Sequence, residues 1–193
     1  MKLWRGILCV MLLVSFWGCR AQNPMVVFQT DLGDIEVEIL ERSAPVTAEN
    51  FLRYVDEGLY DGAAFYRVVT MDNQPDNDVK IEVIQGGIRF AEGKTGFDPI
   101  IHETTRETGL LHKDGVISMA RSDPGTASSE FFFCIQDQPE LDFGGKRNPD
   151  GQGFSAFGRV TGGMDVILKI QRQPAVGQML VERVGISRVS RIR

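Results

Sequence analysis

A series of short apolar runs, each bounded by polar or turn-forming residues, constrains the fold of this chain more than any other feature. Short runs rich in Val, Ile and Phe are typical of β-strands. In one of them Ile35, Val37 and Ile39 are separated by glutamates, as in a strand with one buried face. An open sheet of many short strands would leave exposed edges, and closure removes these edges. The sequence therefore predicts a mainly β fold, a closed antiparallel barrel. The expected strands are 26–30, 35–40, 64–69, 81–85, 116–120, 131–135, 156–160 and 181–192.

Two segments show helical periodicity instead. After Pro45, apolar residues recur at helical spacing as far as Val55, and Gly58 supplies a left-handed stop. A second helix is expected over 163–171. Polar stretches separate several of the apolar runs, and loops of this size in a compact domain are commonly functional. These stretches are 71–80, 121–130 and 142–153.

The beginning of the chain predicts an export signal at 1–19. Lys2 and Arg5 precede an apolar run at 7–16. That run is shorter than the ~20 residues that span a bilayer, so a transmembrane anchor is the less favoured interpretation. We expect 20–24 to be a short tether and 25–193 to be one folded domain. A segment of this length is long enough to bury a hydrophobic core by itself.

The end of the signal resembles a bacterial lipobox. Residues 16–19 read Phe-Trp-Gly-Cys, and in such a motif the cysteine, here Cys19, becomes the lipidated first residue of the mature protein. Phe16 and Trp17 are bulkier than lipoprotein processing usually accepts. Ordinary cleavage after Ala21, which would give a soluble exported protein, therefore stays open as the alternative.

Charge and cysteine usage exclude several classes of protein. Loss of the signal removes Lys2 and Arg5, so 21 basic residues become 19 against 26 acidic ones and the net charge moves from −5 to −7. The basic residues are scattered, so nucleic acid is not an expected partner. Cys134 is the only cysteine in the body of the chain, so a disulfide framework is not expected. Its apolar surroundings predict a buried, inert thiol.

The usual catalytic constellations are absent from the sequence. His102 and His112 lack cysteine or carboxylate partners at ligand spacing, so we expect no metal site and interpret both as solvated or capping histidines. No nucleophile elbow, phosphate-binding loop or dinucleotide fingerprint occurs. Arg67 is unusual because it lies within an apolar strand. Taken alone, such an arginine faces solvent more often than it serves a function, and both interpretations remain open.

Six blocks of sequence resemble the motifs of the cyclophilin-type peptidyl-prolyl cis/trans isomerases, in the same order. The blocks are 47–51 (Thr-Ala-Glu-Asn-Phe), 65–69 (Phe-Tyr-Arg-Val-Val), 84–87 (Ile-Gln-Gly-Gly), 115–120 (Gly-Val-Ile-Ser-Met-Ala), 129–132 (Ser-Glu-Phe-Phe) and 157–160 (Phe-Gly-Arg-Val). The resemblance covers the chain from about Met25 to its C-terminus. It implies an eight-stranded antiparallel barrel capped by two α-helices, with a proline-binding groove on its outer face.

The resemblance also implies roles for individual residues. Arg67 corresponds to the catalytic arginine, and Gln85 to the glutamine beside it. Three positions match the apolar pocket for the proline ring: Met119, Phe132 and Leu141. Ala120 and Arg121 match the stretch that pairs with the substrate backbone.

Several positions in the expected groove depart from the family pattern. Tyr66 replaces a histidine, which matters little if its side chain faces away from the pocket. Glu82 and Glu140 stand where aromatic residues are common, Glu130 replaces a glutamine, and Phe154 replaces a histidine or tyrosine. The three glutamates predict an acidic groove with altered substrate preference. Weak binding of cyclosporin-type macrocycles is expected because Glu140 stands at the family position that often supplies an indole to such ligands.

The implied reaction requires little machinery. Rotation about an X-Pro bond faces a barrier of ~18–20 kcal/mol because the amide is resonance-stabilised. A guanidinium that favours the twisted amide and an apolar pocket that holds the ring are sufficient, so no cofactor or metal is expected. The resemblance therefore implies a monomeric isomerase that acts on proline-containing polypeptides and assists the folding of exported proteins. A module that binds proline segments without catalysis is the alternative, because an acidic groove would suit recognition of basic segments.

Overall fold

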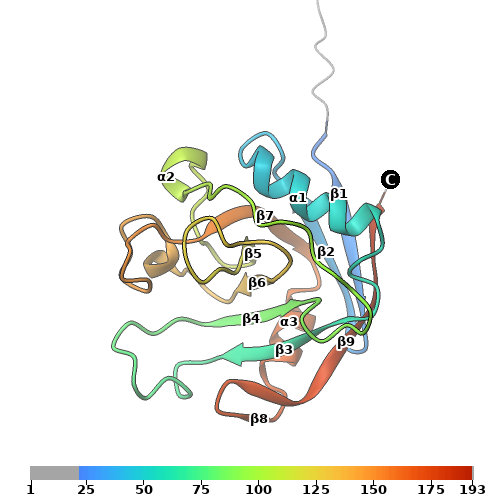
Figure 1. Ribbon diagram of the computed structural model, residues 1–193. Coiled ribbons are helices and arrows are strands. Elements are labelled where there is room, and N and C mark those ends of the chain that lie inside the picture. Colours follow the sequence, from blue (N-terminus) through green and yellow to red (C-terminus); the bar gives the residue numbers. More distant parts are fainter. Residues whose placement is uncertain (1–21, 193) are drawn as a thin grey trace, which may run out of the picture.

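The computed structural model describes residues 22–192, which form a closed antiparallel β-barrel (Figure 1). Its strands follow the order β1-β2-β7-β5-β6-β4-β3-β9, and pairing of β1 with β9 closes the barrel. A two-residue strand, β8, pairs with the beginning of β9 outside this circuit. The strands are β1 (Met25–Thr30), β2 (Gly33–Ile39), β3 (Ala63–Val69), β4 (Val83–Gly87), β5 (Val116–Met119), β6 (Phe131–Cys134), β7 (Ser155–Gly162), β8 (Ala175–Val176) and β9 (Met179–Ile192).

Two helices of the expected length pack against the barrel. Helix α1 (Pro45–Asp56) packs on β7 and β9, and α3 (Met164–Gln171) packs on β2, β3 and β4. The N-terminus of α1 lacks a local side-chain cap. Instead the carboxylate of Glu103 accepts hydrogen bonds from the backbone N–H groups of Val46 and Thr47 at 3.2 and 2.7 Å. A residue far along the chain therefore satisfies the unpaired donors of the first helical turn.

The prediction of a closed barrel with two capping helices is confirmed, with additions. Besides β8, the structure contains a one-turn helix α2 (Thr105–Thr108) and a 3₁₀ turn at Pro139–Leu141. Thr104 and Glu107 form a capping box that stabilises α2, which is too short to show helical periodicity. Strand β4 begins at Val83 rather than at Ile81.

The barrel interior is filled largely by aromatic side chains. Phe131 lies at its centre with no exposed surface, and its ring centroid is 5.3 Å from that of Phe28 and 5.4 Å from that of Tyr60. Tilted and edge-on rings of this kind stabilise one another beyond the effect of their burial. Other rings in contact with Phe131 are Phe51, Phe65 and Phe133.

Strand β6 is buried on both faces, which gives the fold a second apolar cluster outside the barrel. Alternation along the strand turns Phe131 and Phe133 inward and Phe132 and Cys134 outward. The outer cluster comprises Val69, Ile81, Val83, Phe132, Cys134 and Leu141. Cys134 is fully buried there, so the prediction of a buried cysteine is confirmed, and burial raises the pKa of its thiol, which disfavours the reactive thiolate. This outer cluster forms the floor on which the functional site is built.

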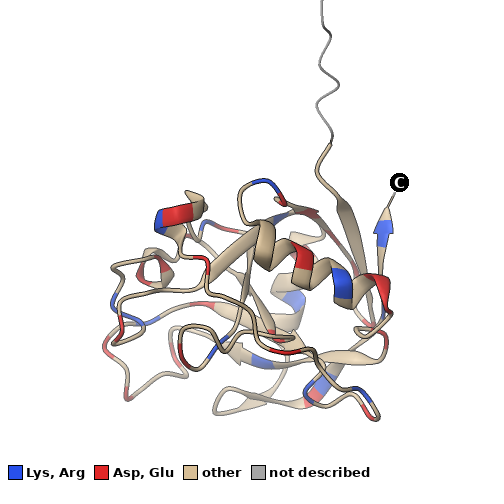
Figure 2. Ribbon diagram, turned by 45° about the horizontal axis from the view of Figure 1, so that its top comes forward, with Lys and Arg blue, Asp and Glu red and all other residues tan. Residues whose placement is uncertain are grey.

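The N-terminal predictions fall outside the described residues. The expected signal at 1–19, with Cys19, lies before residue 22, where the described part of the chain begins. Among residues 22–192, no helix is long and apolar enough to cross a membrane, and no group of three His, Cys, Asp or Glu could hold a metal ion. Basic and acidic residues are interspersed along the described ribbons (Figure 2).

Candidate active site

A β-bulge in β3 places two adjacent polar side chains on the same side of the barrel wall. Phe65 pairs with Gly86 and Arg67 pairs with Gln85, so Tyr66 is the extra residue of the bulge. Phe65 and Val68 point into the core, whereas Tyr66 and Arg67 both reach the side chain of Gln85. A bulge re-aims side chains in this way at the edges of functional sites. Tyr66 therefore does not face away from the site, so the condition under which its replacement of a histidine would matter little is not met.

Arg67 is held by two amide oxygens. Its Nη1 donates to Oε1 of Gln85 at 2.7 Å, while Nε and Nη2 donate to Oε1 of Gln178 at 3.0 and 2.6 Å. No carboxylate of the described residues forms an ion pair with it. Burial lowers the pKa of the guanidinium, yet an arginine remains protonated under ordinary conditions. The site thus contains a positioned positive charge that the protein does not neutralise.

Gln178 is a site residue that sequence reasoning missed. It lies in the turn between β8 and β9, and the backbone of this turn is fixed to the β3 side of the site. The backbone N–H of Val68 donates to the carbonyl of Gln178 at 2.8 Å, and the Asn73 side chain donates to the carbonyl of Gly177 at 3.1 Å. No local sequence pattern joins Gln178 to Arg67, which is 111 residues away.

A hydrogen-bonded relay continues from Gln85 to an acidic residue. Nε2 of Gln85 donates to the Tyr66 hydroxyl at 2.8 Å, and this hydroxyl donates to Oε2 of Glu130 at 2.5 Å. Burial and the adjacent Glu130 carboxylate raise the pKa of Tyr66, so the hydroxyl stays protonated as a donor. The relay fixes the Gln85 amide with its oxygen toward Arg67. Glu130 therefore orients the site, while its carboxylate also lines an adjoining depression beside Arg89.

A pocket of about 260 Å³ opens beside Arg67 on the outer cluster. Apolar side chains share its wall with arginine and amide groups, and Phe132 meets Phe154 edge-on with centroids 5.2 Å apart. The pocket is thus suited to a small apolar ring with a cation at its edge. Its lining consists of Arg67, Ile81, Val83, Gln85, Ala120, Arg121, Phe132, Leu141, Arg147, Asn148 and Phe154.

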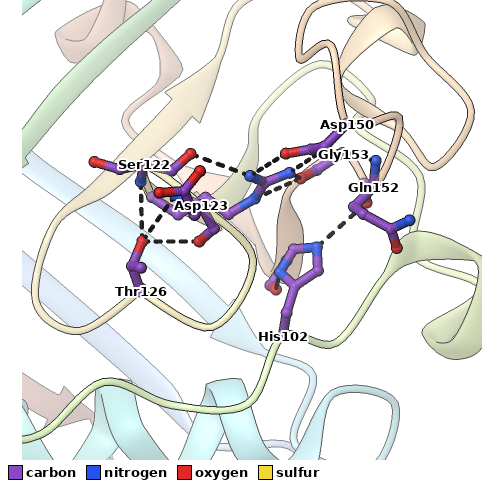
Figure 3. Close-up of polar contacts among 9 residues, drawn as sticks. His102, Ser122, Asp123, Thr126, Asp150, Gln152 and Gly153 are labelled. Atoms are coloured by element: carbon purple, nitrogen blue, oxygen red, sulfur yellow. Dashed lines mark hydrogen bonds and ion pairs between the residues drawn. The ribbon is translucent and has the colours of Figure 1, made fainter.

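Arg121 lies in the wall of this pocket, but its guanidinium has a structural role. Nη1 and Nη2 contact the two oxygens of Asp150 at 2.7 and 2.9 Å. Nε and Nη2 donate to the carbonyl of Gly153 at 2.9 and 2.5 Å, and Nη1 donates to the carbonyl of Ser122 at 3.3 Å (Figure 3). These contacts use every N–H group of the guanidinium. Arg121 therefore anchors the loop after Asn148, and only its backbone is free to pair with a bound peptide.

His112 supports the pocket from beneath. Its ring is buried and stacks on Phe132, with 13° between the planes. Nδ1 contacts Oδ1 of Asp142 at 2.7 Å, and Nε2 contacts the Ser118 hydroxyl at 2.9 Å. The expectation of a solvated or capping histidine is wrong for His112. The Ser118 hydroxyl is fully buried, so this Ser-His-Asp arrangement cannot reach a substrate and serves the packing of Phe132.

His102 lies apart from the pocket floor. Its ring contacts the Ser155 hydroxyl at 3.0 Å and the carbonyl of Gln152 at 3.2 Å (Figure 3). Burial lowers its pKa, which favours the neutral ring. His102 is thus a half-buried link between the loop that joins β4 to α2 and the loop held by Arg121.

The comparisons with known proteins agree with this geometry. Residues 25–191 match the family model described as cyclophilin type peptidyl-prolyl cis-trans isomerase. The chain belongs to this family. Arg67, Gln85, Phe132 and Leu141, which the cyclophilin resemblance places in the site, do converge on one pocket.

Relatives of this cyclophilin include bacterial enzymes. The chain is 36% identical over 156 residues to a peptidyl-prolyl cis-trans isomerase of Acinetobacter baylyi, covering 79% of this chain and 74% of the relative. It is 36% identical over 151 residues to peptidyl-prolyl cis-trans isomerase B of Escherichia coli, covering 76% and 84%. A crystal structure of a cyclophilin-type isomerase from Cryptosporidium parvum aligns with a TM-score of 0.71 at 20% identity, covering 89% of this chain and 98% of that chain. This last similarity shows the fold.

Met119, predicted to form part of the cyclophilin pocket, instead faces the barrel core. It is fully buried in the inner cluster, because alternation along β5 turns Ile117 and Met119 inward. Val83 and Ile81 contribute the apolar wall that Met119 was expected to provide. Sequence reasoning missed both residues because the polar insertion before β4 obscures the alignment there.

Glu82 and Glu140 are also displaced from the predicted groove. Glu82 lies on the opposite face of its segment from Ile81 and Val83, and its carboxylate accepts a long hydrogen bond from Gln171 of α3 at 3.4 Å. The Glu140 carboxylate accepts the backbone N–H of Lys146 at 2.8 Å and closes its own loop. The prediction of an acidic groove is therefore wrong for Glu82 and Glu140, while Glu130 lines the adjoining depression. The charged residues that line the pocket itself are arginines.

Proposed function

We propose that this site accelerates cis–trans rotation of X-Pro bonds in polypeptides. The observation that carries the proposal is the Arg67 guanidinium, held at the edge of an apolar pocket by the oxygens of Gln85 and Gln178. These partners are neutral, so they fix the direction of the guanidinium without cancelling its charge. A fixed charge in a partly buried site stabilises charge that develops during a reaction more strongly than a solvated charge does.

The chemistry of the twisted amide explains why such a site is sufficient. At the top of the rotational barrier conjugation is lost and the prolyl nitrogen regains its lone pair. The contacts with Gln85 and Gln178 use three of the five N–H groups of Arg67, which leaves one on Nη1 and one on Nη2 without an acceptor among the described residues. Donation from these groups toward the nitrogen and the prolyl carbonyl favours the twisted state over either planar state. No bond is broken, and no proton needs to be transferred.

The apolar wall holds the substrate while the bond rotates. Phe132, Leu141 and Phe154 provide contact area for a proline ring, and Ala120 lies between this pocket and the adjoining depression. If the ring is held in place, the residue before proline rotates relative to it, and the bound geometry keeps the amide close to Arg67 during the rotation.

A reporter peptide with one X-Pro bond tests the function. The domain formed by residues 22–193 should raise the rate of cis–trans exchange at a protein concentration well below that of the peptide. A module that only binds proline segments would saturate with peptide and leave this rate unchanged. The acidic groove that motivated this alternative is absent from the described pocket, so catalysis is the favoured function.

Gln178 provides a test of how Arg67 is positioned. In Gln178→Ala the guanidinium loses the acceptor of two hydrogen bonds, and we expect kcat to fall by about tenfold or more, with a much smaller change in KM, since misplacement of a catalytic group mainly affects the transition state. Gln178→Glu keeps an acceptor but adds a charge that pairs with Arg67, so it should also lower kcat. Full activity in both variants would show that Gln85 alone positions Arg67.

The N-terminal sequence supports a further proposal about location. We propose that the mature protein is exported, carries a lipid on Cys19 and acts as a monomer on proline-containing polypeptides outside the cytoplasm. The basis is the charged start, the apolar run and the lipobox-like ending at 16–19. The wild-type protein should fractionate with membranes, and Cys19→Ala should not be lipidated. Recovery of soluble wild-type protein that begins at Gln22 would favour ordinary signal cleavage instead.

A further inference from the structure

The proline pocket contains a second arginine that the isomerisation chemistry does not require. Arg147 lies in the loop between the 3₁₀ turn and β7, and it lines the same pocket as Arg67. Arg121, the other arginine of the wall, is neutralised by Asp150. No acidic residue lines the pocket among the described residues. Arg67 and Arg147 are therefore two positive charges that share one small, partly apolar space.

The position of Arg147 is built by two loops that extend from the same side of the barrel (Figure 1). Its Nη1 donates to Oε1 of Gln74 at 2.8 Å and to the carbonyl of Val79 at 2.6 Å. Gln74 is buried and in turn donates to the carbonyls of Thr70 and Ile81 at 2.7 and 2.8 Å. The loop between β3 and β4 thus holds one nitrogen of the guanidinium through neutral acceptors. Nε and Nη2 have no acceptor among the described residues.

Two further observations indicate that this arrangement lacks an anionic partner. Burial and then the like charge of Arg67 lower the pKa of Arg147, as expected where two cations face one another. In addition, Nδ2 of Asn148 is buried without a hydrogen-bond acceptor in the described part of the chain, and Asn148 lines the pocket beside Arg147. A buried donor without a partner is costly in a folded protein and indicates a missing acceptor.

A carboxylate would supply the acceptor that Nε and Nη2 of Arg147 lack. It carries the opposite charge, accepts hydrogen bonds at two oxygens and matches the planar fork of a guanidinium. Phosphate has the same acceptor character, but a polypeptide bound through its proline ring presents carboxylates directly. The carboxylate can come from an Asp or Glu side chain next to the proline, or from the free C-terminus of a chain that ends in proline.

We propose that Arg147, together with Asn148, selects X-Pro segments that carry a carboxylate within one residue of the proline. This inference rests on the proposed isomerase function and names its substrate class. It reverses the preference for basic segments that an acidic groove would have given. Because the charge is partly buried, the selection should weaken with added salt less steeply than a contact between fully exposed charges.

Capped peptides that differ at one position test the selection. One set places Glu, Gln or Lys directly after the proline, a second set places them directly before it, and a third pair ends at proline as the free acid or the amide. We expect kcat/KM to be at least about fivefold higher for a carboxylate peptide than for its neutral counterpart, and lowest for Lys. The set that shows the difference identifies the source of the carboxylate.

Matched arginine variants assign the effect. In Arg147→Gln the ratio between the carboxylate and neutral peptides should fall to about one, whereas Arg147→Lys should keep part of it. Arg159→Gln is the control, because Arg159 is exposed on β7 and pairs with Glu38 away from the pocket. A ratio near one in the wild type, or a high ratio that survives in Arg147→Gln, would overturn the proposal.

Binding measurements separate this inference from the function on which it rests. If no peptide isomerises, the proposed function fails, and Kd values from NMR titration of the same peptides still test carboxylate selection. If every peptide isomerises at the same rate and binds with the same Kd, the isomerase function stands and the role of Arg147 is refuted. The comparison of carboxylate and neutral peptides on the wild-type protein needs no variant. A ratio near one there refutes the proposal even if Arg147→Gln does not fold.

Discussion

Arg67→Ala should lower kcat/KM for X-Pro isomerisation by at least about 100-fold, the loss expected when a positioned donor to a transition state is removed. Its free energy of unfolding should change by less than about 2 kcal/mol, because the amide groups of Gln85 and Gln178 become accessible to water beside an open pocket. The measurements are steady-state exchange rates and chemical denaturation of both proteins.

Two variants make the Arg67 result specific. Arg67→Lys keeps the charge but loses the planar fork that contacts both glutamines, so its activity should lie between those of wild type and Arg67→Ala. Arg159→Ala removes an exposed arginine of β7 and should leave the rate unchanged. Loss of activity in Arg159→Ala, or wild-type activity in Arg67→Ala, would show that overall charge rather than the placed guanidinium matters.

Phe131→Ala should destabilise the domain by about 3–5 kcal/mol, the range for truncating a buried phenylalanine. Phe131 touches five other aromatic rings inside the barrel, which are positioned by separate strands and by α1 and its following loop. A cavity at this place cannot be filled by movement of one neighbour. Thermal and chemical denaturation measure the loss.

The neighbouring residue provides the matched control. Phe132 points to the opposite face of β6, where it lines the pocket and lies against Phe154 and His112. Phe132→Ala should therefore destabilise the domain less than Phe131→Ala while impairing peptide binding more. Equal effects of the two substitutions on stability and on KM would contradict the assignment of inner and outer faces.

Much of the barrel could be predicted because burial follows local alternation. Ile35, Val37 and Ile39 point into the core as their spacing predicts, and the helix from Pro45 ends where Gly58 follows. The prediction for Met119 failed because its position within a motif was taken as evidence for the pocket, whereas alternation along β5 turns the side chain inward. The motif identified the correct strand. Which side of the barrel wall each side chain lies on depends on how that strand pairs with its neighbours.

The residues that sequence could not place are those fixed by distant contacts. Gln178 reaches Arg67 only because the β8–β9 turn is bonded to the β3 side of the site, and Arg147 enters the pocket only because Gln74 and Val79 hold it. The bulge at Tyr66 likewise depends on the register between β3 and β4. The local sequence around these residues does not predict such contacts, because hydrogen bonds to neutral acceptors in distant loops require no periodic pattern and no pair of opposite charges.

Exchange NMR on a capped peptide with one X-Pro bond tests the central claim most directly. Uncatalysed exchange takes tens to hundreds of seconds, so the free peptide gives no cis–trans exchange cross-peaks at short mixing times. With a substoichiometric amount of the wild-type domain, we predict cross-peaks between the cis and trans resonances, and their loss in Arg67→Ala. Chemical shift changes that show binding to the wild-type domain without any such cross-peaks would contradict the account.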